Sequence, residues 1–199
     1  KIAYSSNNGD SWTAKEITNQ LGTLVGLGIS GSGGSRVLHT GFYESDNDTG
    51  TYVIHYASSS NNGDTWTTTT VDNALGLYME AVDGWLSFGA PISFSVDSSG
   101  DPAFSYSVPI EIDVSDYGIG NQFPTTSTIR YAVKQDGSWT TSTVDTVSYT
   151  LDPNSLNFFP SDLSFNADTP IIGYLGNDLA PGFAVNTSTF YTGSPTTTP

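Results

Sequence analysis

The chain has 199 residues, and its 5 Lys or Arg against 20 Asp or Glu leave a formal net charge of −15 at pH 7. So few cations cannot form a basic face for a phosphate backbone, which argues against nucleic-acid binding. The apolar runs are far shorter than the ~20 residues of a membrane-spanning helix, and the absence of Cys removes disulfides, a thiolate nucleophile and Cys-bound metals.

Three segments of the chain repeat one pattern of residues. Each contains an Ile-x-Tyr triplet, a turn that includes Gly, a Trp preceded by Ser or Thr, and a Thr-rich run; they begin at Ile2, Ile54 and Ile129. The alternating triplet and the β-branched run favour strands. The Asn-Gly or Asp-Gly pair supplies the positive φ values that a tight turn needs. Each segment is therefore predicted to form a β-hairpin.

Further pairs of strands are expected between these hairpins, because apolar and polar residues alternate there on either side of a turn. The predicted strands cover residues 24–29, 36–43, 92–96, 103–108, 163–165 and 171–175. The Gly-rich stretch 31–34 is expected to be a turn, since it lacks the Lys and the following helix of a phosphate-binding loop. No segment clearly favours a helix, and the best candidate is 75–82.

The first two Gly turns resemble a known repeat. Ser-Ser-Asn-Asn-Gly-Asp-Ser-Trp at 5–12 and Ser-Ser-Asn-Asn-Gly-Asp-Thr-Trp at 59–66 are similar to the Asp-box, the Ser-x-Asp-x-Gly-x-Thr-Trp hairpin of BNR repeats in sialidase-like β-propellers. Asn replaces the usual Asp, and in the irregular third copy Gly stands two residues before Trp instead of three. The matching positions are Ser5, Asn7, Gly9, Trp12, Ser59, Asn61, Gly63, Trp66, Asp136, Gly137 and Trp139. The resemblance implies an all-β, β-propeller-like fold of four-stranded antiparallel blades, with each Trp packed inside its blade.

The repeats predict one propeller-type domain over residues 1–191, followed by a Thr- and Pro-rich tail or linker at 192–199. The expected blades cover about 24–71, 91–144 and 161–191. Residues 1–17 contain only the outer hairpin of a blade, which would leave strands unpaired. Either the chain is part of a larger propeller, or the hairpin completes the strands at 161–175 in the same chain, or it completes a neighbouring subunit.

The chain lacks residues that the resemblance would require for sialidase chemistry. Sialidase-type enzymes bind a carboxylate with three arginines and use a Tyr nucleophile, a neighbouring Glu and an Asp acid/base, whereas this sequence has only Arg36 and Arg130. Glu is scarce, and most Asp residues stand in turns, where their side chains have a structural use. We therefore expect no catalytic residue and no cofactor.

Two acidic stretches are weak candidates for a Ca²⁺ site. Residues 46–48 and 113–116 could supply carboxylate ligands, but neither follows the EF-hand spacing, so both are interpreted as solvated loops. His39 and His55 are expected on neighbouring strands, and without a third ligand they do not predict a zinc site.

A few residues stand outside the repeat pattern. Trp85, Tyr117 and Phe123 are the candidates for contact with a ligand such as a glycan; alternatively, the loop around Tyr117 and Phe123 covers an edge or a subunit interface. Asn47 and Asn186 begin Asn-x-Ser/Thr sequons and are candidate glycosylation sites. Together with the Ser/Thr/Pro tail, they favour an extracellular or cell-surface location.

Three functional hypotheses remain open. The first is a non-catalytic extracellular structural or adhesive module, a subunit of a surface assembly or fibre that self-associates through its N-terminal hairpin. The second is a carbohydrate-binding, lectin-like propeller. The third is a fragment of a glycoside hydrolase whose catalytic residues lie outside these 199 residues.

Overall fold

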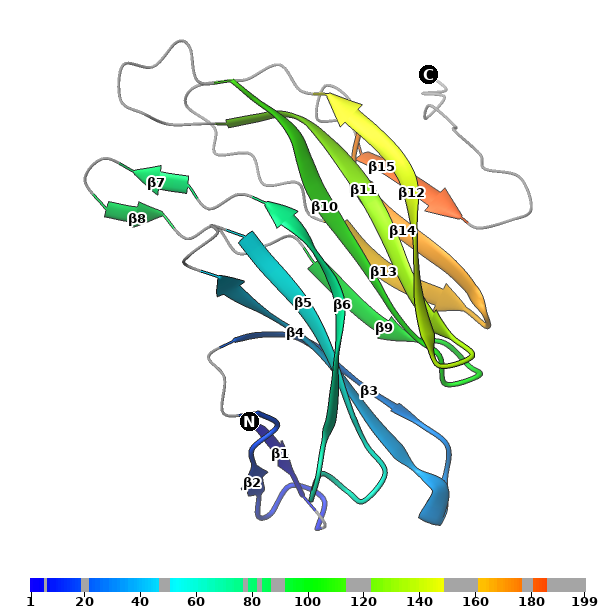
Figure 1. Cartoon of the computed structure of the whole chain (residues 1–199). Coiled ribbons are helices and arrows are strands. Elements are labelled where there is room, and N and C mark those ends of the chain that lie inside the picture. Colours follow the sequence, from blue (N-terminus) through cyan, green and yellow to red (C-terminus); the bar gives the residue numbers. More distant parts are fainter. Residues whose placement is uncertain are drawn as a thin grey trace.

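The computed structural model is an all-β structure, as the sequence predicts, with antiparallel pairing in every sheet (Figure 1). It describes residues 1–5, 7–18, 22–46, 51–76, 79–81, 84–86, 92–113, 123–148, 161–176 and 181–185.

Three sheets, each made of consecutive strands, form most of the molecule. The first sheet contains β3 (Thr23–Ser30), β4 (Val37–Asp46), β5 (Thr51–Ser59) and β6 (Thr67–Gly76). The second sheet contains β9 (Ile92–Val96), β10 (Pro102–Asp113), β11 (Phe123–Gln135) and β12 (Ser138–Ser148). The third sheet contains β13 (Ser161–Asn166), β14 (Thr169–Leu175) and β15 (Pro181–Val185).

The remaining elements are short. β1 (Ile2–Tyr4) pairs with β2 (Thr13–Lys15) as the N-terminal hairpin, and β7 (Met79–Ala81) pairs with β8 (Gly84–Leu86). The Gly-rich stretch forms the expected turn, which includes the 3-10 helix η1 (Gly33–Ser35). The helix candidate is wrong: residues 75 and 76 end β6, and 79–81 form β7.

The sheet limits coincide with the predicted repeat units within a few residues. The first two units, expected at 24–71 and 91–144, occupy the first and second sheets. In the third unit the structure describes three strands, and the outer strand expected at 189–191 lies outside the described residues. The agreement arises because alternation and turn residues act locally, within each pair of strands.

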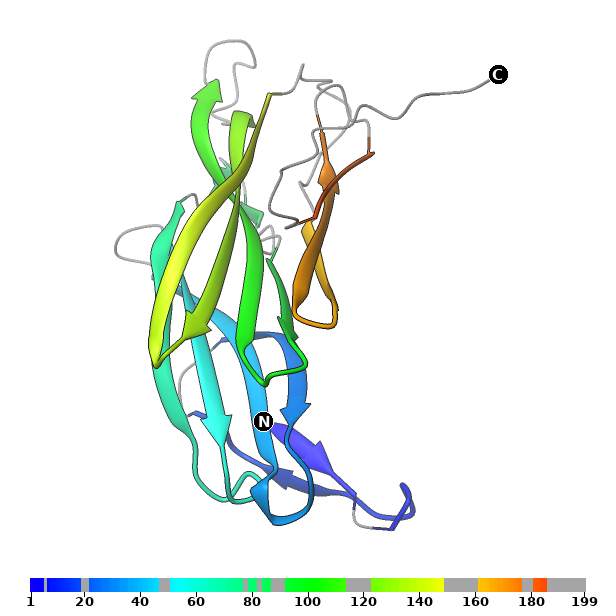
Figure 2. The same ribbon diagram turned by 90° about the vertical axis from the view of Figure 1, so that its right-hand side faces the viewer.

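The three sheets stack face to face in chain order, as Figures 1 and 2 show from two sides. The first strand of the second sheet, β9, packs against both β3 and β13. Successive side chains of a strand point to opposite faces of its sheet. A sheet in the middle of a stack can therefore bury the side chains on both of its faces. Among the described strands, the stack is open and no sheet closes into a barrel or ring.

Two apolar clusters hold the stack together. One lies between the first and second sheets and consists of Ile54, Tyr56, Val71, Phe104, Tyr106, Val108 and Ala132. The other lies between the second and third sheets and consists of Ala103, Ile129, Val133, Val147, Leu163 and Ile172. The second sheet therefore contributes to both, with alternate residues of β10 and β11 on opposite faces.

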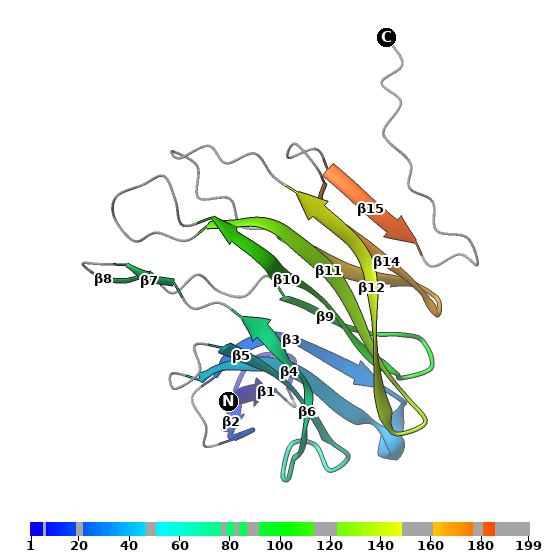
Figure 3. The same ribbon diagram turned by 45° about the horizontal axis from the view of Figure 1, so that its top comes forward.

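The N-terminal hairpin lies beside the first sheet, at the end of the stack away from the third sheet in all three views (Figures 1–3). β1 and β2 form a two-stranded sheet of their own. The expected alternative in which the hairpin completes the strands at 161–175 of the same chain is therefore not the arrangement of this structure.

Candidate functional site

The first Asn-Gly turn joins β1 to β2 through a compact set of hydrogen bonds. The hydroxyl of Ser5 accepts from the Gly9 N–H at 2.8 Å and donates to Asn7 Oδ1 at 2.9 Å. The same oxygen of Asn7 accepts from the Ser11 N–H at 2.9 Å, while Asn7 Nδ2 donates to Ser11 Oγ at 2.9 Å. The side chains thus satisfy backbone groups that a tight turn would leave unpaired.

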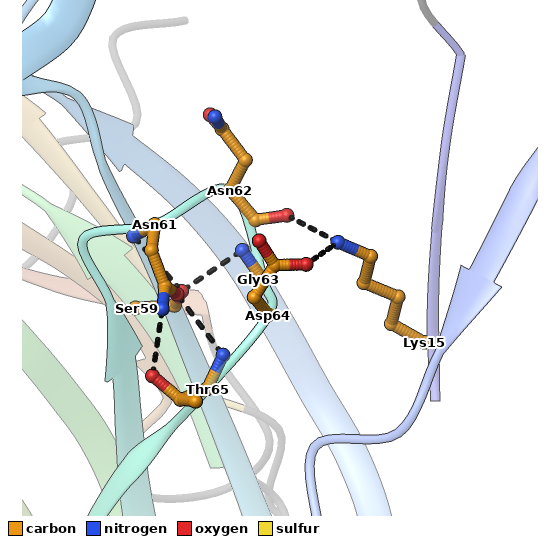
Figure 4. Close-up of polar contacts among 7 residues, drawn as sticks. All are labelled: Lys15, Ser59, Asn61, Asn62, Gly63, Asp64 and Thr65. Atoms are coloured by element: carbon orange, nitrogen blue, oxygen red, sulfur yellow. Dashed lines mark hydrogen bonds and ion pairs between the residues drawn. The ribbon is translucent and has the colours of Figure 1, made fainter.

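The second turn, between β5 and β6, repeats this set atom for atom (Figure 4). Ser59 Oγ accepts from the Gly63 N–H at 2.9 Å and donates to Asn61 Oδ1 at 2.8 Å. Asn61 accepts from the Thr65 N–H at 3.0 Å and donates to its hydroxyl at 2.8 Å. Asn62 and Gly63 have φ values of 58° and 82°, and glycine adopts such values without steric cost. The two turns that repeat in the sequence therefore also share the same side-chain hydrogen bonds.

The third copy has a shorter turn. Gln135 pairs with Ser138, so that only Asp136 and Gly137 stand between β11 and β12. Both have positive φ, 51° and 80°, which is the geometry of a two-residue hairpin turn. This length explains why Gly is one residue closer to Trp139 than in the other copies.

The three Trp residues that follow these turns have different surroundings. Trp139 packs against the first apolar cluster, edge-on to Tyr56 with ring centroids 5.5 Å apart, and Trp66 is half-buried. Trp12 is 66% exposed, so the prediction that every Trp packs inside a blade is wrong for this copy. The physical reason is that the hairpin of two three-residue strands provides too little surface to cover an indole.

The hairpin contacts the second Asn-Gly turn through Lys15 (Figure 4). The ammonium group of Lys15 donates to the carboxylate of Asp64 and to the carbonyl of Asn62, and it lies 5.1 Å from the ring centroid of Tyr4. The hydrogen bond with Asp64 raises the pKa of Lys15. Ile2 is buried on the same side, close to Gly63. One cation and one apolar side chain therefore hold the hairpin beside the β5–β6 turn.

An apolar row on β3 is exposed in the described part of the chain. Leu24, Leu27 and Ile29 are 50%, 53% and 57% exposed, and they pair with β4 residues on one face of the first sheet. Single exposed apolar residues are ordinary, but a row along one strand is typical of an interaction surface. This row was not predicted from the sequence, although the alternation of Gly with large apolar residues in TLVGLGIS indicates it.

A polar network lies between the first and second sheets. His39 Nε2 is 2.7 Å from Ser30 Oγ, and His39 Nδ1 is 2.7 Å from the Tyr56 hydroxyl. Burial lowers the pKa of His39, and the nearby Lys134 lowers it further. A Ser–His contact can activate a nucleophile, but here the Gly100 turn of the second sheet packs against the Ser30 side chain. The two hydrogen bonds of His39 join three strands of the first sheet, and the packing of the Gly100 turn leaves the Ser30 hydroxyl little room for a substrate.

A second network engages one of the two arginines. Arg130 Nη1 donates to Asp72 Oδ2 at 3.2 Å, and the Tyr106 hydroxyl donates to the same oxygen at 2.7 Å. Burial raises the pKa of Tyr106, with a further contribution from the hydrogen bond to Asp72. The network joins β6 to β10 and β11, so Arg130 serves the packing of the first two sheets.

The two histidines do not come together. His55 Nε2 is 2.7 Å from Glu44 Oε1 and its ring stacks on Phe42, whereas His39 contacts Ser30 and Tyr56. Among the side chains that the structure describes, no group of three His, Asp or Glu is placed to hold a metal ion.

The other predicted site residues lie outside the described residues or on strands whose side chains are not described. Tyr117, Asn47 and Asn186 lie outside the described residues, as do residue 48 and residues 114–116 of the two acidic stretches. Trp85 and Phe123 lie on β8 and β11, where only the backbone is described.

Comparison with known protein families, with curated proteins and with solved structures found no match to this chain. No helix in the described part of the chain is long and apolar enough to cross a membrane.

Proposed function

We propose that this chain is a non-catalytic extracellular structural or adhesive module, built from propeller-like blades with Asp-box turns, that works as a subunit of a surface assembly. The observation that carries the proposal is the exposed row of Leu24, Leu27 and Ile29 on one face of the first sheet. Burial of apolar area drives association at roughly 25 cal/mol per Å², so such a surface favours contact with another chain.

The Asp-box interpretation is supported by the side chains of the first two turns. The Ser and Asn residues of both copies make the same hydrogen bonds to the same turn positions. Stacked four-stranded meanders are the architecture that such hairpins would have in a propeller. A ring would then need further blades from other chains or from adjoining sequence.

Polar side chains that bond to one another within the fold support a structural role. Arg130 is paired with Asp72, and His39 is buried against Ser30 and Tyr56. Each of these groups links neighbouring strands or sheets, as is expected of a polar network that orients a core. The excess of acidic residues, a net charge of −15, favours solubility outside the contact surface.

The test is the assembly state of the native protein, measured by mass photometry over a series of concentrations with negative-stain images alongside. Closed oligomers or fibres are expected. A protein that remains a 21.1 kDa monomer at every concentration would refute the proposal.

Carbohydrate binding is the second candidate, and the exposure of Trp12 favours it. An indole that is 66% exposed on a hydrogen-bonded turn presents a flat apolar face of the kind that sugars stack on. A glycan array with the native chain and the Trp12→Ala variant tests this. Binding that is lost in the variant would support the second candidate, and a folded native chain that binds no glycan would remove it.

A further inference from the structure

The two Asn-Gly pairs of the chain lie in identical stretches of sequence. Ser-Ser-Asn-Asn-Gly-Asp occurs at 5–10 and again at 59–64, and no other Asn of the chain precedes a Gly. Asn is a thermolabile residue, and a following Gly makes it more so, because Gly has no Cβ atom to hinder attack of its nitrogen on the Asn side chain. Since the neighbouring residues are the same, a difference in reactivity between the two pairs must come from the fold.

The reaction is deamidation through a cyclic imide. The backbone nitrogen of Gly loses its proton to solvent and attacks Cγ of the preceding Asn. A bond forms between this nitrogen and Cγ, the bond from Cγ to Nδ2 breaks, and Nδ2 leaves as ammonia. Water then opens the ring at either carbonyl, which yields Asp or isoaspartate. Water is the only co-reactant, so the rate depends on how often the Gly nitrogen is free to attack.

Both turns hold the Gly nitrogen in the same hydrogen bond. The Gly9 N–H donates to Ser5 Oγ at 2.8 Å, and the Gly63 N–H donates to Ser59 Oγ at 2.9 Å. The preceding Asn residues have φ values of 57° and 58°. The two sites therefore have the same local geometry, and in each the nitrogen becomes available only when the turn opens.

The surroundings of the two Gly residues differ. Gly63 is buried, and a Cβ atom there would lie 3.2 Å from Cδ1 of Ile2 and 3.7 Å from Cδ of Lys15. The ammonium group of Lys15 also donates to the carbonyl of Asn62 (Figure 4). Gly9 is exposed, and no described atom lies within 4 Å of its Cβ position. The first turn can therefore open without displacing a neighbouring side chain of the described residues.

The strands that carry the two turns differ as well. The first turn joins β1 and β2, which have three residues each and form a two-stranded sheet. The second turn joins β5 and β6, which have nine and ten residues and belong to a four-stranded sheet. A short two-stranded hairpin is marginally stable, and local opening costs least where few contacts hold the backbone. The first turn should therefore open far more often than the second.

We propose that Asn8 is a site of spontaneous deamidation in the folded protein, and that the fold protects Asn62 from the same reaction. The isoaspartate product at position 8 lengthens the backbone within the turn. The Gly9 N–H then no longer lies in register with Ser5 Oγ, so the hydrogen bonds of the first turn are lost. The modification alters the N-terminal hairpin and leaves the β5–β6 turn intact.

The test compares the two sites within one molecule. The native chain is incubated at mildly alkaline pH, and samples are taken over several weeks. Chymotrypsin, which cleaves after aromatic residues, releases residues 5–12 and 57–66, and electron-transfer fragmentation distinguishes Asn, Asp and isoaspartate in each peptide. Asn8 should deamidate at least about tenfold faster than Asn62. In guanidinium chloride, where the fold is absent, the two rates should agree within about twofold.

A matched pair of variants provides a readout on the intact protein. Each deamidation adds a negative charge, so isoelectric focusing detects an acidic form that accumulates with time. Asn8→Gln should lose most of this acidic form, because the longer Gln side chain closes the ring far more slowly. Asn62→Gln should accumulate it at the native rate, and far-UV circular dichroism confirms that both variants are folded.

Several outcomes would overturn the inference. Equal rates at the two sites of the folded chain would show that the fold protects neither or both. Unequal rates in guanidinium chloride would assign the difference to residues 11 and 65, where the two stretches first diverge. An acidic form that accumulated at the native rate in Asn8→Gln would place the reaction elsewhere in the chain.

Discussion

Gly41 offers a direct test of how closely the first two sheets pack. It lies on β4, and a Cβ atom at this position would lie 2.8 Å from Cζ of Phe104 and 3.0 Å from Cγ of Phe94. Phe104 is fully buried, and its ring centroid lies 4.9 Å from that of Phe94 and 5.6 Å from that of Trp139. The ring therefore has no free space to move into, and a single methyl group must push the sheets apart.

We expect Gly41→Ala to lower the free energy of unfolding by about 1–3 kcal/mol, the usual cost of overpacking a filled core. For a domain of this size, each kcal/mol corresponds to roughly 2–4 °C in Tm. Urea unfolding followed by tryptophan fluorescence gives the free energy, and a thermal scan gives Tm. An unchanged slope of the urea transition would show that the variant alters stability and not the extent of unfolding.

Gly173→Ala is the matched control. Gly173 also lies on the second strand of its sheet, but no atom of the described residues is within 4 Å of its Cβ position. The substitution should therefore change the free energy of unfolding by no more than about 0.5–1 kcal/mol, in the stabilising direction, because Ala reduces the entropy of the unfolded chain. If Gly41→Ala behaved like this control, the first two sheets would not be packed as described.

Three further predictions concern the turns and the titratable groups. Ser59→Ala should cost about 1–3 kcal/mol in urea unfolding, because it leaves the buried Gly63 N–H without its acceptor, whereas Ser5→Ala in the exposed hairpin should cost less than about 1 kcal/mol. Burial raises the pKa of Tyr131 to about 12, with Asp97 and Asp101 nearby, so the folded state retains a proton that the unfolded state releases near pH 10. Stability should therefore fall as the pH rises from about 10 to 12, and Tyr131→Phe should reduce that loss in thermal scans across this range. Burial, followed by the charges of Asp97, Asp136 and Asp168, raises the pKa of Asp101, so its ionised form is disfavoured in the folded protein. Asp101→Asn should then raise Tm at pH 7, and a gain that persisted undiminished below pH 3 would contradict this electrostatic cause.

The turn residues show how far local chemistry can be read from sequence. The Asn-Gly and Asp-Gly pairs predicted three hairpins, and all three are present, with positive φ at Asn8, Asn62 and Asp136. Strand order within each sheet followed from the same signals, because consecutive strands joined by short turns pair with each other. The short third turn was also visible in the spacing of Gly137 and Trp139.

The candidate site could be predicted only in part. The repeat suggested the same environment for every Trp, yet Trp139 packs in a core and Trp12 is exposed. The turn before Trp139 joins two strands of a stacked sheet, whereas the turn before Trp12 joins the two short strands of the hairpin. The Ser30–His39–Tyr56 network joins residues on three strands whose spacing in sequence has no motif. No local pattern distinguishes such a network from ordinary strand residues.

The sequence by itself determined the all-β class, the turns and the order of strands, because period-two alternation and positive-φ residues act over a few positions. Only the tertiary structure decided which face of each sheet is covered. The rows Gly26–Gly28 and Leu27–Ile29 alternate on one strand, and either could have faced the second sheet. The choice depends on Phe94 and Val96, about 70 residues away in the chain. Bringing residues so far apart into contact costs loop-closure entropy, and this cost cannot be read from a short segment of sequence.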